Sequence, residues 1–184
     1  MPRNRLHIAS LRELERLGVS RLAIGGVFGY ELIRRGRIIS RGRGKNGVTT
    51  VGLNDMLDDY FRGTAQISTW YAGLVDNAAF TALAAADTMA SHTGWSESTA
   101  YSNANRITYS PAAASGGIIT NTASVAAFSI NATATIKGAF LTSNNTKAGT
   151  TGTLFSTGAF DATQAVVNAD TLNITYELTL QALA

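Results

Sequence analysis

The chain has 184 residues, which is long enough for one domain with a hydrophobic core. Its 15 Lys and Arg and 12 Asp and Glu give a net charge of +3, and charged residues make up only 15%. Cysteine is absent, which excludes disulfides and thiolate metal sites. Small uncharged side chains can pack against another protein without desolvating a charge, so this composition favours a subunit of an assembly over an enzyme.

The charge is unevenly distributed along the chain. Residues 1–62 hold 12 of the 15 basic residues and 6 of the 12 acidic residues, whereas residues 63–184 are net acidic. We therefore expect two parts: a basic N-terminal arm over 1–62 and a β domain over 63–184.

Six basic residues form a cluster without any acidic residue between them: Arg34, Arg35, Arg37, Arg41, Arg43 and Lys45. Such a cluster can bind phosphates or an acidic protein surface. No aromatic residue is interleaved with it, so stacking on single-stranded bases is unsupported. We favour an acidic protein partner over nucleic acid.

Two helices and a hairpin are expected in the N-terminal arm. Residues 9–17 read as a short helix, because Ser10 and Glu13 form a capping box. Residues 27–43 are typical of a hairpin that turns at 34–36, and Asn46-Gly47 predicts a second turn.

The second helix is predicted from the spacing of its apolar residues. Leu53, Met56, Leu57 and Tyr60 recur at helical intervals from Thr50, and Gly63 ends the pattern.

Beyond Gly63 the pattern is mostly that of strands separated by turn residues. Strands are predicted over 66–75, 106–110, 117–122, 124–130 and 133–142, and the Ala-rich stretch 77–94 fits either a short helix or a packed loop. Residues 172–180 alternate strictly between apolar and polar, as in a strand with one buried face. The fold class expected is mainly β, a β-sandwich or jelly-roll-like domain with an N-terminal helical and hairpin arm.

The sequence contains no motif that we interpret as catalytic or cofactor-binding. Gly42 to Gly47 match G-x-G-x-x-G, but no helix follows directly, so we interpret this stretch as a flexible turn. His7 and His92 lack the neighbours that a metal site requires. Asp55 and Asp59 share a helix face, which is more typical of a solvated surface or of counter-charges to the Arg cluster than of an acid–base pair. We expect no enzymatic activity, no metal and no cofactor.

Three aromatic residues are candidates for an interface: Trp70, Tyr71 and Trp95. They fit either a contact with a partner or the filling of the core, and the apolar neighbours of Trp70 favour the second interpretation.

Four stretches resemble a family of tailed-bacteriophage virion proteins. They are residues 48–57 (VTTVGLNDML), 69–76 (TWYAGLVD), 94–106 (GWSESTAYSNANR) and 132–141 (ATATIKGAFL). The family is similar to small capsid decoration (cement) proteins, which bind the outside of an icosahedral shell and clamp neighbouring major capsid subunits. Some relatives are tail or fibre components, and the resemblance transfers no catalytic residue.

The resemblance implies a virion protein on the capsid exterior, made in the host cytoplasm. Its expected partners are the major capsid protein and further copies of itself, as a dimer or trimer. Nucleic acid is not expected as a partner, and no membrane contact is expected, since no run of 18 apolar residues occurs. The alternative is a tail or fibre component that contacts the host or the tail machinery.

Overall fold

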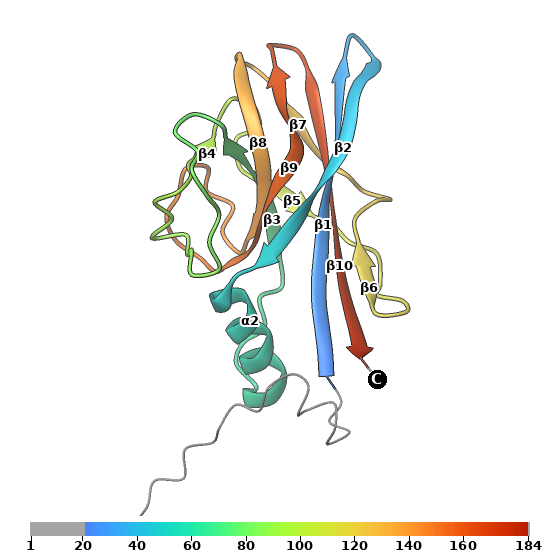
Figure 1. Cartoon of the computed structure of the whole chain (residues 1–184), viewed down its shortest axis with the longest axis vertical. Helices are drawn as coiled ribbons and strands as arrows, with labels where there is room; N and C mark the ends of the chain where they lie inside the picture. Colours follow the sequence, from blue (N-terminus) through green and yellow to red (C-terminus); the bar gives the residue numbers. More distant parts are fainter. Residues whose placement is uncertain (1–20, 184) are drawn as a thin grey trace, which may run out of the picture.

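The computed structural model describes residues 21–183, and the fold is mainly β. Ten strands form one antiparallel sheet in the order β4-β3-β8-β9-β2-β1-β10-β6, with β5 pairing with β3 and β7 with β10 (Figure 1). The strands are β1 (Arg21–Arg34), β2 (Arg37–Val48), β3 (Trp70–Asp76), β4 (Glu97–Ser98), β5 (Ile107–Tyr109), β6 (Ile118–Thr120), β7 (Ala126–Ser129), β8 (Ala134–Thr142), β9 (Leu154–Val166) and β10 (Thr171–Leu183). The predicted mainly-β, sandwich-like class is therefore confirmed. The helix predicted over 9–17 lies outside the described residues.

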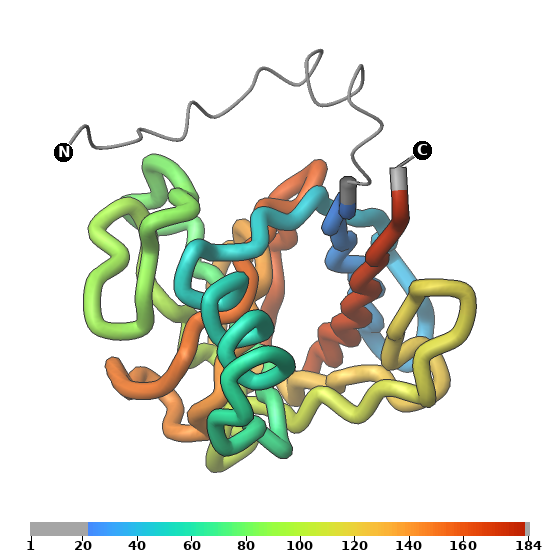
Figure 2. The backbone as a smooth tube through the Cα atoms, turned by 90° about the horizontal axis from the view of Figure 1, so that it is seen from below, coloured from blue at the N-terminus to red at the C-terminus, as the bar shows by residue number. Residues whose placement is uncertain are grey.

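The sheet curls into a half-barrel that surrounds the main core. Seen from below, the tube trace bends around an interior that the helical segment partly closes at one end (Figure 2). Alternate residues of β1 and β10 point inward: Phe28, Tyr30 and Leu32 on one strand, Leu172, Ile174 and Tyr176 on the other, all at most 4% exposed. The period-two pattern predicted for the last strand is confirmed at these positions.

The long β1–β2 hairpin confirms the turn predicted around 34–36. Arg35 and Gly36 occupy the two-residue loop with φ of 51° and 73°, and positive φ at both positions is what a type I′ turn requires. A register shift between Leu32 and Ile33 leaves Ile39 as an extra residue in β2.

The hairpin is part of the sheet, which corrects the expected division at residue 62. β1 pairs with β10 from Arg21↔Leu183 to Ile33↔Thr171, and β2 pairs with β9. Both strands are therefore central strands of the β domain from Arg21 onward, and no separate arm exists in the described part of the chain.

The turn predicted at Asn46-Gly47 is wrong, and so is the flexible turn predicted for Gly42 to Gly47. All of these residues lie in β2, where Asn46 and Gly47 pair with Gly158 and Thr157 of β9. Gly44 is needed for packing, since a Cβ there would lie 2.0 Å from the Ala159 carbonyl oxygen. Gly44 thus allows two strands to approach closely instead of letting the chain bend.

The helix predicted from Thr50 to Gly63 is confirmed. It comprises α2 (Thr50–Leu57) and one π-helical turn, η1 (Asp58–Arg62). The Thr49 hydroxyl caps it by accepting a hydrogen bond of 3.0 Å from the Gly52 amide. Gly63 ends it in the left-handed conformation, with φ of 64°.

The Ala-rich stretch 77–94 is a packed loop, the second of the two alternatives. It contributes Met89 to a smaller core with Val75, Trp95, Phe140 and Leu154. The predicted strands 106–110, 117–122, 124–130 and 133–142 correspond to β5, β6, β7 and β8, and 66–75 to β3, which starts only at Trp70. Strand β9, the partner of both β8 and β2, is not among the predicted strands.

Candidate functional site

Five exposed cations lie along β2 and its turn, and we call them the basic strip: Arg35, Arg37, Arg41, Arg43 and Lys45. Arg41, Arg43 and Lys45 alternate with the half-buried or buried Gly42, Gly44 and Asn46, because successive strand residues point to opposite faces. None of the five forms an ion pair with any residue of 21–183. The strip can therefore offer its charges to an external partner.

Arg34, the sixth predicted contact residue, is held within the fold. Its guanidinium donates to both oxygens of Asp170, from Nε at 2.8 Å and from an Nη at 2.7 Å. These hydrogen bonds lower the pKa of the Asp170 carboxyl below its usual value. The pair fastens the β1–β2 turn to the β9–β10 turn, so Arg34 belongs to the scaffold and is not part of the strip.

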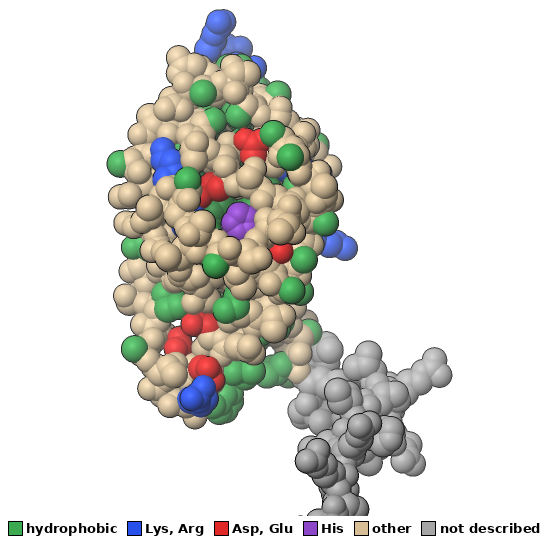
Figure 3. Space-filling view, turned by 90° about the vertical axis from the view of Figure 1, so that its left-hand side faces the viewer, with side chains coloured by type: hydrophobic (Ala, Val, Ile, Leu, Met, Phe, Trp, Pro, Cys, Tyr) green, Lys and Arg blue, Asp and Glu red, His purple; other side chains and the backbone are tan. Residues whose placement is uncertain are grey.

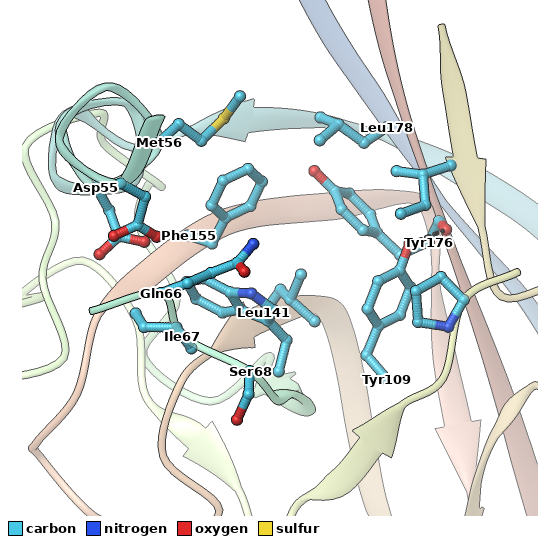
Figure 4. Close-up of a pocket in the computed structure, with 14 residues that line it drawn as sticks. Asp55, Met56, Gln66, Ile67, Ser68, Tyr109, Leu141, Phe155, Tyr176 and Leu178 are labelled. Atoms are coloured by element: carbon cyan, nitrogen blue, oxygen red, sulfur yellow. Dashed lines mark hydrogen bonds between the residues drawn. The ribbon is translucent and has the colours of Figure 1, made fainter. Parts of the chain in front are cut away.

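An apolar groove lies at the opposite end of the half-barrel, and we call it the helix-end groove. Its volume is about 280 Å³, and α2, the chain before β3, and strands β5, β6, β8, β9 and β10 line it. Figure 4 shows Met56 and Phe155 on one side and Tyr109, Tyr176 and Leu178 on the other. Most of the remaining lining residues are also apolar: Ile67, Trp70, Pro111, Ile119 and Leu141.

Acidic side chains of the helix stand at the side of this groove. Asp55 and Asp59 line it, and Asp58 beside them pairs with Arg62 at 3.1 Å. Partial burial, together with the charges of Asp59 and Asp58, raises the pKa of Asp55. A groove with an apolar floor and a carboxylate rim suits a cationic side chain that has an aliphatic stem.

Large apolar side chains are exposed beside the groove on the helix. Tyr60 and Phe61 are 83% and 75% exposed, and Leu53 and Leu57 lie on the same segment. The two aromatic rings stack edge to face with centroids 5.0 Å apart. Figure 3 shows hydrophobic and acidic side chains gathered at this end, and basic side chains at the hairpin end. This explains why Asp55 and Asp59 cannot be counter-charges to the strip, as the sequence suggested.

The predicted interface aromatics are largely inside the fold. Trp95 is 4% exposed, stacks on His92 and donates through Nε1 to Asp87 at 2.9 Å. Trp70 is half-buried against Phe155 and lines the groove, and Tyr71 is half-buried in β3. The exposed aromatics that the structure offers, Tyr60 and Phe61, were not singled out from the sequence.

A buried polar network accounts for much of the stretch 94–106. Glu97 and Arg106, 6% and 0% exposed at their side chains, form two hydrogen bonds of 3.0 and 2.7 Å. Arg106 also donates to the carbonyls of Asn144 and Gly149, and Glu97 accepts from the Ala148 amide. These contacts fasten the β8–β9 loop, so the network is structural.

Metal binding and membrane spanning find no support in residues 21–183. No three His, Asp or Glu side chains of this part come together as metal ligands. His92 is half-buried on Trp95, and His7 lies outside the described residues. No described helix has the length and apolar character needed to cross a bilayer.

Comparison with known proteins adds no relative. The sequence matches no family model, and no curated protein matches it.

Proposed function

We propose that this chain is a capsid decoration protein of a tailed bacteriophage, which binds the outer surface of the major capsid protein through the basic strip. The observation that carries the proposal is the row of five exposed cations along β2 and its turn, where β2 is paired with β1 from Arg37 to Lys45. A strand held in an antiparallel ladder presents charges in a fixed geometry, and this lowers the ordering cost of binding. The partner surface is acidic.

The scaffold supports this role physically. A rigid antiparallel half-barrel and a weakly charged surface suit a subunit that adds many small, symmetry-repeated contacts to a shell. The stretches 48–57, 69–76, 94–106 and 132–141, which resemble virion proteins, fall on α2, β3, β8 and the Glu97–Arg106 network. The resemblance therefore concerns residues that build the scaffold, and the strip adds the attachment surface.

The test uses capsids stripped of this protein. Re-addition of the wild-type chain should restore the thermal and chemical robustness of the shell. Arg41→Glu/Arg43→Glu should bind at least tenfold more weakly, because two attractive charges become repulsive. Stripped shells that are as robust as complete ones, or undiminished binding of the variant, would contradict the proposal.

The exposed Tyr60–Phe61 pair favours a second candidate, a tail or fibre component that contacts the host. Exposed aromatic side chains are frequent anchors of protein contacts. Copy number separates the two candidates, because a decoration protein is present in hundreds of copies per virion and a tail component in a few. Quantitative mass spectrometry of purified virions measures this ratio directly.

A further inference from the structure

Two opposite ends of the molecule are complementary in charge and in apolar character. At the hairpin end, Arg35 and Arg37 are exposed beside Ile38 and Ile39, which are 46% and 50% exposed. At the other end, the helix-end groove combines an apolar floor with Asp55 and Asp59. We propose that the hairpin tip, residues 35–39, of one copy docks in the helix-end groove of a second copy of this chain.

The occupant is inferred from the chemistry of the groove. Its lining is mainly apolar, and within residues 21–183 its only charged members are the two carboxylates, so it favours a segment that carries both cations and aliphatic groups. The tip has this composition over five consecutive residues. The helical segment that borders the groove also exposes Tyr60, Phe61 and Leu57, which add apolar surface at this end of the molecule.

A second copy is required because a chain cannot fill its own groove with its own tip. The β1–β2 turn lies at the top of the sheet and α2 at the bottom (Figure 1). The contact joins two different surfaces, so antiparallel copies make it twice in a dimer and rotated copies close a ring. Arg41, Arg43 and Lys45 lie outside the contact and stay available to the capsid.

Two carboxylates at the helix end lack a cationic partner among the described residues, which supports this placement. Asp58 has Arg62 as a partner, whereas Asp55 and Asp59 have no cationic partner among residues 21–183. Burial and, to a smaller extent, the neighbouring carboxylates raise the pKa of Asp55, and a docked guanidinium would lower it again.

The inference deepens the proposed function but is tested without capsids, by sedimentation velocity of the full chain over a wide concentration range. The tip variant is Arg35→Asp/Arg37→Glu, with Asp at 35 because Asp tolerates the left-handed conformation of that residue. The groove variant is Asp55→Lys/Asp59→Lys. Circular dichroism verifies that each variant is folded.

We expect the wild type to associate with rising concentration and each variant alone to remain monomeric. Mixed together, the two variants should associate with each other, because the unchanged tip of one fits the unchanged groove of the other and the acidic tip fits the basic groove. A chain that carries both sets of changes should associate again, because the charges are exchanged.

The matched control is Arg41→Glu/Arg43→Glu, which reverses two charges on the same strand outside the tip. This variant should associate like the wild type and lose only capsid binding, which separates failure of this contact from failure of the attachment proposal. A monomeric wild type would overturn the inference. So would a groove variant that loses association while the tip variant keeps it, because the occupant would then be another segment, such as residues 1–20.

Discussion

At the scale of single residues, buried charges are used to fix loops in place. Glu97 and Arg106 lie nine residues apart in the sequence, yet both are buried and their remaining hydrogen bonds go to the backbone of the β8–β9 loop. Removing one partner leaves an uncompensated charge in a region from which water is excluded.

Glu97→Gln should therefore lower the free energy of unfolding by about 3–5 kcal/mol, because Arg106 would stay buried without its counter-charge. Urea denaturation followed by circular dichroism measures the change. Asp58→Asn is the matched control, since it breaks the exposed Arg62 pair and should change stability by less than about 0.5 kcal/mol. Equal effects of the two substitutions would refute the structural role of the buried pair.

At the scale of elements, the glycines of β2 decide how closely strands approach. Gly44 faces the backbone of Ala159 and Phe160, whereas a Cβ at Gly47 meets nothing within 4 Å. The two positions lie on the same strand with opposite steric demands.

Gly44→Ala should lower the free energy of unfolding by about 1–3 kcal/mol, because the added methyl group requires β2 and β9 to move apart. Gly47→Ala should leave stability nearly unchanged, and thermal unfolding of both variants gives the comparison. The explanation fails if the substitution at 47 is as costly as the one at 44.

At the scale of the whole molecule, buried tyrosines set the alkaline limit of stability. Burial, with a smaller contribution from the charge of Glu177, raises the pKa of Tyr109 to about 12, and burial raises the pKa of Tyr101 and Tyr176 as well. A phenol that holds its proton more tightly in the folded state stabilises the fold fully below the unfolded pKa of 10.0.

Stability should accordingly be constant up to about pH 10 and should then fall as the pH rises toward 12. Denaturation midpoints measured across this range test the direction. Tyr109→Phe should show a shallower decline than the wild type, since one of the titrating groups is gone. An undiminished slope in this variant would assign the alkaline loss to other groups.

Local patterns predicted both β10 and the helical segment. The alternation in β10 reflects one buried face, whereas the apolar spacing of the helical segment does not, because Leu53, Leu57 and Tyr60 are exposed. A local sequence pattern predicts the wrong structure where pairing with a distant segment determines the backbone conformation. Asn46-Gly47 has turn composition, but pairing with Gly158 and Thr157 of β9 holds it in an extended strand. β9 itself begins with five consecutive buried residues, and three consecutive exposed residues follow at 161–163, so it carries no clear alternation.

The candidate site could be predicted only in part. The cations of the basic strip were visible in the sequence because they are close together along the chain. The partner of Arg34 was not, since Asp170 lies 136 residues away. The helix-end groove is formed by residues that lie between Asp55 and Leu178 in the sequence. A local sequence pattern cannot predict that residues so far apart line one groove.

The pairing of β2 with β9 has a mechanical consequence. The strands on the two sides of this junction are joined by long ladders within each half, but across it only Asn46, Gly47 and Val48 pair, with Gly158, Thr157 and Ser156. A load that pulls the two groups of strands apart therefore acts on three residue pairs of the ladder and on a few side-chain hydrogen bonds, such as that from Tyr30 to Asp161. Under tension we expect this short ladder to separate before the longer ladders on its two sides.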